Sequence, residues 1–318
     1  MTLDEVRDLG SAIDREVGKA VLGQSPVVRL LTVALLAPGH VLLEGPPGTA
    51  KTLLAQSFAR TLGLEYGRIQ FTPDLMPGDI LGSSLFNFQT STFTLTRGPV
   101  FCELLLADEI NRTPPKTQAA LLEAMQERAV TLDGRTERLS DHFTVLATQN
   151  PIEQQGVYPL PEAQLDRFLF KIAIDYPDIA AERAIVAQYG ARSGSPHPED
   201  SGVAQVADAE AIDAAGAAVG AIRLSEPVIG YIVDLVRATR EHPDIATGAS
   251  PRAASALAGA ARAAAALDGR DYVIPDDVKL LARPLLRHRV TLSPSAEIDG
   301  RRVDDVVAGL IDQTEAPR

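Results

Sequence analysis

The chain has 318 residues, a formal net charge of −12, 45% hydrophobic residues and one cysteine, Cys102. The length suggests about two domains, and the apolar fraction is enough for two cores. The single cysteine excludes an internal disulfide. The acidic balance excludes a broad positive field that would attract nucleic acid or anionic membranes. No apolar stretch approaches the roughly 18 residues of a membrane span and the acidic N-terminus is unlike a signal peptide, so we expect a soluble, cytoplasmic protein.

Two helices and a strand are predicted at the start of the chain. Residues 4–21 carry apolar side chains at helical spacing, and residues 26–37 form a second helix. A Val-Leu-Gly-Gln turn that contains Gly23 and Gln24 separates the two helices. The apolar run 41–43 then predicts a short buried strand.

A phosphate-binding loop is predicted directly after this strand, because a glycine-rich turn leads from it into an apolar-periodic helix that starts near Leu53. Glycines allow successive N–H groups to converge on the phosphates of a nucleotide, and the helix N-terminus adds its positive end. We expect Lys51 to reach the β- and γ-phosphates and the Thr52 hydroxyl to bind magnesium. The predicted loop residues are Gly45, Pro46, Pro47, Gly48, Thr49, Ala50, Lys51 and Thr52.

Ala50 departs from the usual GxxxxGK[ST] pattern, which has glycine before the lysine. Alanine suits this position if the residue has right-handed helical dihedrals, because only a positive φ would penalise it. The turn at Gly23 and Gln24 is a candidate adenine contact, since such a segment often packs against adenine in P-loop ATPases. Taken alone, the turn is more typical of a simple helix connection.

An insertion is predicted before the next strong strand. Residues 68–71 are a weak strand candidate, and residues 73–99 do not form one long helix because Pro77-Gly78 starts a turn or a short helix. Two β-prone segments follow, at residues 84–88 and 92–96. The insertion is either a surface loop or a protrusion that contacts a partner.

An acidic pair follows the second strong strand, residues 100–107. Asp108 and Glu109 lie at its carboxyl end, the edge where open α/β sheets bind ligands. Asp108 can hold magnesium and Glu109 can polarise an attacking water, and an amide could fill neither role. Such a pair is usually a solvated strand end, but its position about 60 residues after a phosphate loop makes it a strong signal.

The next elements are a helix and a hairpin. Thr113 is expected to cap a helix that has proline at its first position and runs to residue 128. Residues 130–139 alternate about Asp133-Gly134, which is a specific hairpin signal.

Two more strands carry candidate residues at their ends. Asn150 follows a third strong strand, residues 143–148, and reaches the same sheet edge as Asp108, where it could orient water or sense the γ-phosphate. In isolation, Asn-Pro is simply a turn. Arg167 precedes a fourth strand, residues 168–174, and spacing alone favours a surface ion pair for this arginine.

The last third of the chain reads as helical. The segment 191–202 is rich in Gly, Pro, Ser and charged residues, so we expect a linker between a nucleotide-binding core of residues 1–190 and a helical domain of residues 203–318. Helices are predicted over 209–222, 226–241, 251–267, 275–286 and 303–311. Arg252 lies in the first turn of one of them, where the helix dipole disfavours a cation by roughly 0.3–1 kcal/mol. A phosphate beside Arg252 would reverse that sign.

With these residues assembled, the chain resembles the AAA+ ATPases, and within them the MoxR family, over nearly its whole length. The most specific stretches are 45–52, 106–112, 147–154, 160–168 and 248–252. The resemblance implies an α/β P-loop core with a parallel five-stranded sheet flanked by helices, followed by an all-α lid domain. It implies that Asn150 is the sensor-one residue, Arg252 the sensor-two arginine, and Arg167 an arginine finger that enters a neighbouring subunit's site.

The resemblance also implies two insertions, the helix-two insert near residues 73–99 and a hairpin insert near residues 129–140. Alanine at position 50 is common in that family. Arg112 also matches a family position, with no role assigned to it.

The implied function is ATP hydrolysis by a ring of identical subunits, a hexamer, with magnesium as cofactor. Lys51, Glu109, Asn150, Arg167 in trans and Arg252 in cis form the implied catalytic set, and rotation of the lid would drive the inserts against a client protein. The family is associated with chaperone-like remodelling or maturation of proteins, often with a partner that carries a von Willebrand factor A domain. Alternatives are a chelatase-type motor subunit, a nucleic-acid motor, which the acidic balance disfavours, and a non-hydrolysing nucleotide switch, which the Asp108-Glu109 pair disfavours.

Overall fold

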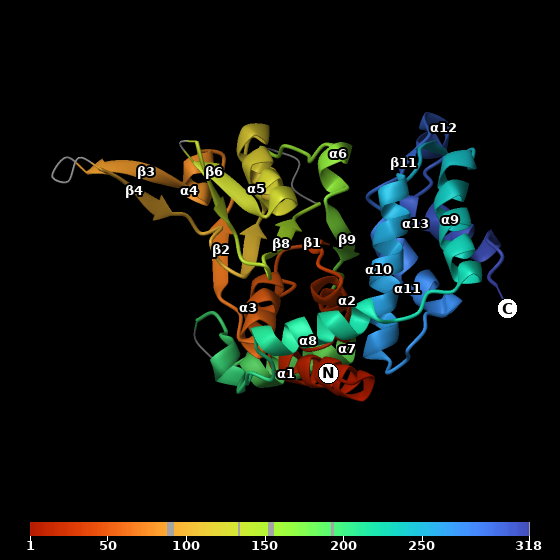
Figure 1. Cartoon of the computed structure of the whole chain (residues 1–318), viewed down its shortest axis with the longest axis horizontal. Coiled ribbons are helices and arrows are strands. Elements are labelled where there is room, and N and C mark those ends of the chain that lie inside the picture. The colour runs from red at the N-terminus through yellow and green to blue at the C-terminus, as the bar shows by residue number, and fades with distance from the viewer. Residues whose placement is uncertain (88–91, 133, 152–155, 192–193, 318) are drawn as a thin grey trace.

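The computed structural model describes the chain except residues 88–91, 133, 152–155, 192–193 and 318 (Figure 1). A five-stranded sheet forms its centre, with the strand order β2-β5-β8-β1-β9, and all neighbouring strands are parallel. The strands are β1 (His40–Glu44), β2 (Tyr66–Gln70), β5 (Leu104–Asp108), β8 (Thr144–Gln149) and β9 (Phe168–Ala173). The predicted parallel sheet is therefore confirmed.

The second strong strand is shorter than predicted. Residues 100–103 form a turn and bends, and only Leu104–Asp108 pairs with its neighbours. Val100 and Cys102 are buried in the turn, so the apolar run that predicted a long strand instead fills the core with loop residues. Burial raises the pKa of the Cys102 thiol to about 12, which keeps this cysteine in its protonated, unreactive form.

Each central strand sends alternate side chains to two separate apolar clusters, as the two-residue period of a strand requires. Val41 and Leu43 face the cluster that contains α1 (Leu3–Gly18), α2 (Ser25–Leu36) and α3 (Lys51–Leu62), whereas Leu42 faces the opposite one. That second cluster contains α4 (Pro77–Leu81), η1 (Ile110–Arg112) and α5 (Pro115–Glu127). Two cores exist, as the composition allows, but the sheet separates them rather than a domain boundary.

The two predicted inserts are present as hairpins. β3 (Gly82–Asn87) pairs antiparallel with β4 (Thr92–Arg97), directly after α4, and the hairpin projects from the body of the molecule at the left of Figure 1. β6 (Ala129–Leu132) pairs with β7 (Arg135–Arg138). Phe88 and Asp133, which belong to the predicted strand and turn, lie outside the described residues.

Thr113 does not cap α5, contrary to the sequence prediction. Pro114 occupies the N-cap position and makes no side-chain cap. The Thr113 hydroxyl instead donates to the Thr72 carbonyl oxygen at 2.6 Å, which fixes the insert to the core. The predicted inward residues of this helix, Leu121, Leu122 and Met125, are buried.

The C-terminal part is mostly helical. After α6 (Glu162–Leu165), α7 (Ile179–Tyr189) and η2 (Pro198–Ser201), the helices are α8 (Ala209–Gly220), α9 (Glu226–Glu241), α10 (Pro251–Leu267), α11 (Pro275–Leu286), α12 (Pro294–Ile298) and α13 (Val303–Gln313). A small antiparallel pair, β10 (Ile245–Thr247) with β11 (Thr291–Leu292), was not predicted. Within the described ranges, no helix combines the length and apolar character required to cross a bilayer.

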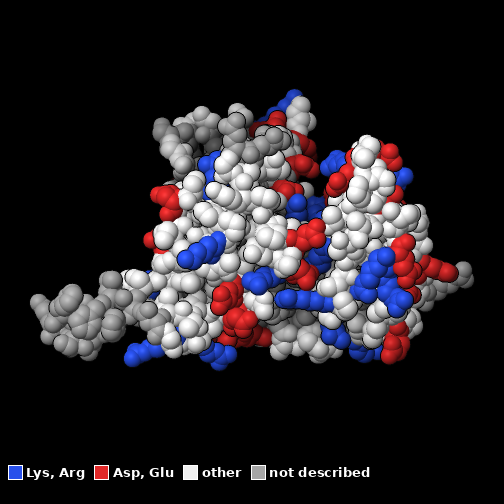
Figure 2. All heavy atoms as spheres, turned by 90° about the horizontal axis from the view of Figure 1, so that it is seen from above, with Lys and Arg blue, Asp and Glu red and all other residues white. Residues whose placement is uncertain are grey.

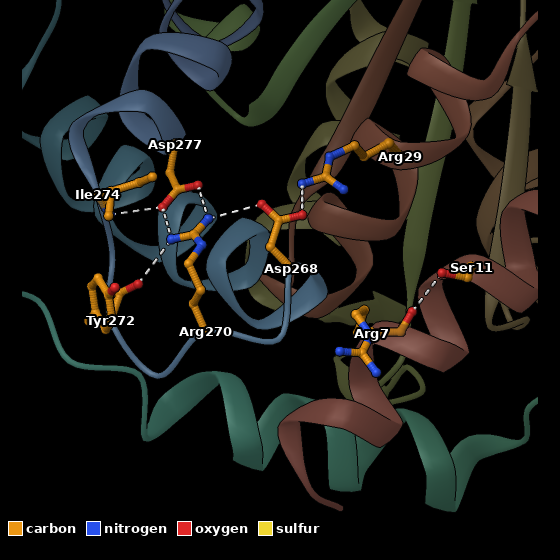
Figure 3. A network of polar contacts seen from close by, with 8 residues as sticks. All are labelled: Arg7, Ser11, Arg29, Asp268, Arg270, Tyr272, Ile274 and Asp277. Atoms are coloured by element: carbon orange, nitrogen blue, oxygen red, sulfur yellow. Dashed lines mark hydrogen bonds and ion pairs between the residues drawn. The ribbon is translucent and has the colours of Figure 1, made fainter.

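The lid is joined to the core by close packing. The alanine-rich face of α10 is fully buried, and its small side chains allow contact with α1 and α2 in one continuous apolar cluster. Arg29 of α2 donates to Asp268 at 2.7 Å, and Asp268 also accepts from Arg270, which forms a two-pronged pair with Asp277 (Figure 3). These contacts bind the lower end of the lid to the N-terminal helices.

Two fully buried histidines make the stability of this fold dependent on pH. His40 at the start of β1 contacts the Met125 carbonyl oxygen at 3.1 Å and accepts from the Val145 amide at 3.0 Å. Burial lowers the pKa of His40 from 6.5 to about 4, and burial also lowers the pKa of His288 well below 6.5. Below pH 6.5 the unfolded chain therefore binds protons that the folded chain excludes.

We expect the free energy of unfolding to be highest above pH 6.5 and to fall as the pH decreases toward 4. His40 alone should contribute a loss of about 2 kcal/mol between pH 7 and pH 5. Urea unfolding at the two pH values measures this loss, and His40→Gln, which retains a donor and an acceptor, should show a smaller one. An identical loss in both proteins would contradict the assignment to His40.

Candidate active site

The predicted phosphate loop, the acidic pair and Asn150 meet at one edge of the sheet. A cavity of about 830 Å³ opens at the carboxyl ends of β1, β5 and β8. The predicted residues that line it are Gln24, Pro47, Gly48, Thr49, Ala50, Lys51, Thr52, Asp108, Glu109 and Asn150. Parallel strands place their carboxyl ends together, which is why residues far apart in the sequence converge there.

The phosphate loop joins β1 to α3 through residues 45–50. Gly45 is required by a close approach, because a Cβ atom there would lie 2.3 Å from the Ile174 carbonyl oxygen. The amides of residues 48–52 donate to no other group in the described part of the chain. Free amides at the start of a helix form an anion site.

Lys51 is folded back onto its own loop. Its ammonium donates to the carbonyl oxygens of Gly45 at 2.9 Å and Pro46 at 2.8 Å, and lies 3.3 Å from the Thr49 hydroxyl. Burial lowers the pKa of Lys51, whereas the nearby Asp108 and Glu109 carboxylates act in the opposite direction. The ammonium must leave the two carbonyls to contact a phosphate.

Ala50 has left-handed dihedrals, with φ 57° and ψ 25°, so the condition under which alanine carries no penalty is not met. The helix begins one residue later, at Lys51. A left-handed residue with a Cβ costs about 1–2 kcal/mol. Alanine therefore stores strain at the position where the usual motif has glycine.

We expect Ala50→Gly to raise the free energy of unfolding of the nucleotide-free protein by about 1 kcal/mol. Urea unfolding measures the change. Ala55→Gly, inside the same helix, is the matched control and should lower the stability by about 1 kcal/mol or more. If both changes lowered the stability, the strain at Ala50 would be disproved.

Asp108 accepts from two side chains at the end of β5. The Thr148 hydroxyl donates to Oδ1 at 2.7 Å, and the Arg68 guanidinium donates to Oδ2 at 2.7 Å. Among the described residues, no group of three or more His, Cys, Asp or Glu is arranged to hold a metal ion. The donor set of Thr52 and Asp108 nevertheless fits magnesium, which usually takes only one or two protein ligands beside phosphate oxygens and waters.

Glu109 is held in place by its backbone and by two side chains. It has φ 57°, a conformation that costs free energy in a non-glycine residue and is concentrated at functional sites. Its amide donates to the Thr148 hydroxyl at 2.8 Å, and its carboxylate accepts from Gln70 at 2.9 Å and from Arg112 at 3.0 Å. Thr148 thereby links both members of the acidic pair.

The far wall of the cavity is more apolar. It combines the connection between α1 and α2 with α7 and the segment before η2, through Val21, Leu22, Pro177, Ile185, Tyr189 and Pro196. Gly23 does not line the cavity; a Cβ atom at this residue would lie 2.9 Å from the Ala181 side chain, so Gly23 packs against α7. An apolar wall opposite a phosphate loop suits a flat heterocyclic base.

Arg167 and Arg252 do not line this cavity. Arg167 precedes β9 and therefore lies at the amino ends of the parallel strands, opposite the phosphate loop. Burial is the main cause of the lowered pKa of Arg289, and the charge of Arg252, in the first turn of α10, lowers it further. Arg289 binds Asp166 beside Arg167. The action of Arg252 on the phosphates of its own subunit stays a prediction.

Sequence reasoning missed the polar side chains of Arg68, Gln70 and Thr148, which surround the acidic pair. Arg68 and Gln70 lie two residues apart on β2 and therefore project from the same face of an edge strand. That alternation at the carboxyl end of a weak strand was the available signal. Thr148 follows the apolar run Val145-Leu146-Ala147 of β8, and nothing in that run indicates its contact with Asp108.

Two family models match the chain. The ATPase family associated with various cellular activities (AAA) matches residues 40–170, which contain the sheet and the acidic pair. The AAA lid domain matches residues 237–310.

Similar proteins cover nearly the whole chain. "Uncharacterized protein YeaC" of Bacillus subtilis is 43% identical over 97% of this chain and 95% of its own length. "Chaperone MoxR1" of Mycobacterium tuberculosis is 43% identical over 99% and 84%, and "Protein MoxR" of Methylorubrum extorquens is 34% identical over 99% and 97%. The crystal structure of a protein named "putative ATPase" from Cytophaga hutchinsonii superimposes with a TM-score of 0.90 at 38% identity, covering 99% of this chain and 97% of that one.

Proposed function

The chain belongs to the MoxR family of AAA+ ATPases, and from this premise we propose that it hydrolyses ATP to ADP and phosphate in the 830 Å³ cavity. One observation carries the proposal. A lysine and a run of free amides from the loop after β1, and two carboxylates from the end of β5, converge at one edge of the sheet. This is the donor and acceptor set that phosphoryl transfer to water requires.

We assign the roles as follows. Lys51 exchanges the Gly45 and Pro46 carbonyl oxygens for phosphate oxygens, and the amides of residues 48–52 hold the phosphate chain. Thr52 and Asp108 would hold Mg²⁺, which supplies positive charge to the phosphate oxygens when it is bound.

Glu109 acts as the base for water, and Asn150, buried at the end of β8, positions that water. Glu109 must first leave Gln70 and Arg112, so these two residues hold the base in a resting position before substrate binds. Arg68 likewise binds the Asp108 carboxylate before substrate and metal are bound.

The proposed enzyme is a head-to-tail ring, with a hexamer as the proposed size. The Arg167 guanidinium makes no hydrogen bond or ion pair among the described residues, and Arg167 lies at the end of the sheet opposite its own cavity. Figure 2, a view from above Figure 1, shows Lys and Arg side chains, with some Asp and Glu, along the furrow between core and lid. A heterologous interface that closes into a ring places one subunit's end against the next subunit's cavity.

Arg167 and Arg252 then both serve the neighbouring site. This proposal replaces the action of Arg252 in cis. Arg252 lies near Arg289, which binds the Arg167 segment, defined here as residues 166–168. Two arginines that pair with no carboxylate among the described residues would offset the charge that builds on the γ-phosphate of the next subunit.

The proposed purpose of the turnover is chaperone-like remodelling or maturation of client proteins. The hairpin β3–β4 projects from the core just before β5, whose end carries the acidic pair, so a change at the site can be passed to the hairpin. A partner with a von Willebrand factor A domain is proposed from the family resemblance. Capture of proteins on a Glu109→Gln variant held in ATP would identify the client.

Release of phosphate from ATP by the purified chain with magnesium tests the proposed activity. We expect the rate of phosphate release per subunit to rise with protein concentration, because each site needs a neighbouring subunit. A chain that binds ATP and releases no phosphate at any concentration would instead be a nucleotide switch. Stimulation by DNA, or by a chelatase partner protein alone, would favour those motor classes over client remodelling.

A further inference from the structure

Arg289 of the lid binds the core segment that carries Arg167. The Arg289 side chain, only 3% exposed, donates from Nε to Asp166 Oδ1 at 2.6 Å and from Nη2 to the Phe168 carbonyl oxygen at 2.6 Å. Its Nη2 also lies 3.3 Å from the Asp166 carbonyl oxygen, and Nη1 donates to the Leu169 carbonyl oxygen at 3.0 Å. The same Nη1 contacts the carbonyl oxygen of Leu285 in α11.

These contacts bracket Arg167 on both sides along the chain. Asp166 precedes Arg167 and Phe168 follows it, so the backbone at position 167 has little freedom to move relative to Arg289. His288 adds a second contact, from Nε2 to the Phe168 carbonyl oxygen at 2.9 Å, and Thr291 donates to Glu162 of α6 at 2.7 Å. The Arg167 guanidinium itself is left without a hydrogen bond or ion pair in the described part of the molecule.

We propose that Arg289 is a positioning residue, which fixes the Arg167 segment to the lid so that Arg167 is presented in one geometry to the neighbouring subunit's ATP. This inference rests on the proposed function. A buried guanidinium with five acceptors around it is planar and rigid, so it sets the direction of the backbone better than apolar packing does. Lid and finger then move as one unit.

The lid has other attachments, which separates this role from general stability. α10 shares a buried apolar cluster with α1 and α2, and Arg29 binds Asp268 at the lower end of the lid (Figure 3). Loss of Arg289 therefore frees the Arg167 segment without releasing the lid. Asp166, left without its partner, is the residue that then moves.

The first test compares Arg289→Gln with Arg270→Gln. Arg270 is the matched control, because it is also a poorly exposed lid arginine and donates to Asp277 at 2.8 and 2.6 Å and to Asp268 at 2.9 Å (Figure 3). Its side-chain contacts in the described part of the chain do not include residues 166–168. We expect Arg289→Gln to lower kcat by about 10²-fold, as a small misplacement of a catalytic group does, with the Kd for ATP unchanged. Arg270→Gln should retain kcat despite a lower Tm.

The second test asks which site is damaged. Arg289→Gln subunits keep their own phosphate loop, whereas Lys51→Ala subunits keep Arg167 and Arg289. Mixing the two inactive proteins should restore turnover, to about a quarter of the wild-type rate for independent sites in randomly mixed rings. Arg167→Ala mixed with Lys51→Ala should give the same recovery. If Arg289→Gln does not fold, Asp166→Asn takes its place in both tests.

The outcomes separate this inference from the proposed function. No turnover by the wild-type protein would remove the proposed function. Recovery with Arg167→Ala but none with Arg289→Gln or Asp166→Asn would overturn the positioning role alone. An equal loss of kcat in Arg270→Gln would also overturn it, because the effect would then follow from lid stability.

Discussion

Replacing Arg167 by alanine should lower kcat by about 10³–10⁵-fold, the range that arginine fingers contribute to phosphoryl transfer. The Kd for ATP should stay close to the wild-type value, because Arg167 lies at the opposite end of the sheet from the cavity of its own subunit. Steady-state phosphate release gives kcat, and titration with a fluorescent nucleotide gives the Kd. The loss arises because charge on the γ-phosphate is no longer offset from the neighbouring subunit.

Mixing two inactive variants tests whether each active site is shared between neighbouring subunits. Arg167→Ala and Lys51→Ala subunits are each expected to be inactive alone and active together, since each supplies what the other lacks. Arg237→Ala is the control, because this exposed arginine pairs with Glu241 at 3.7 Å on the surface of α9. Unchanged kinetics of Arg167→Ala, or full activity of the wild-type protein as a dilute monomer, would refute the trans role.

Glu109→Gln should bind ATP and hardly turn it over. Removal of a general base costs about 10²–10⁴-fold in rate, and the amide of glutamine cannot take a proton from water. The fold should survive, because the amide oxygen can still accept from Gln70 and Arg112. Single-turnover hydrolysis and equilibrium binding of ATP, measured on the same preparation, distinguish chemistry from affinity.

The matched control for this variant is Glu123→Gln on the exposed face of α5. It makes the same change of charge on the same protein away from the cavity, and its turnover should equal that of the wild type. A wild-type kcat in Glu109→Gln would contradict the assignment of Glu109 as the general base. Loss of ATP binding in that variant would mean that Glu109 acts in binding.

Much of the core could be predicted because its signals are local. The apolar runs that became β1, β8 and β9 are bounded by turn residues, and α9, α10 and α11 begin and end where Pro, Ser and the apolar period indicate. Parallel pairing then places Lys51, Asp108 and Asn150 at one edge without knowledge of any contact.

The errors came from features that depend on contacts between distant parts of the chain. The place of Arg252 likewise depends on the packing of α10 against α1 and α2, so its role in cis stays a prediction. Residues 100–103 read as strand because buried loop residues are as apolar as strand residues. The dihedrals of Ala50 depend on the path that the loop takes around the Lys51 ammonium, which no propensity encodes.

The resting contacts of the site were equally beyond the sequence. Arg68 on Asp108, and Gln70 with Arg112 on Glu109, require the register of β2 against β5, where Arg68 lies beside Leu106 and Gln70 beside Asp108. A register of this kind is set by the whole sheet. Only the presence of polar residues at the end of β2 could have been noted beforehand.

The central claim is that the amides beside Lys51 and the carboxylates of β5 bind an adenine nucleotide with magnesium. Isothermal titration calorimetry of the purified chain with ATP and Mg²⁺ tests it most directly. We expect saturable uptake by the wild-type protein and strongly weakened uptake by Lys51→Ala. No uptake of ATP by the folded wild-type protein, with the metal supplied, would contradict the account.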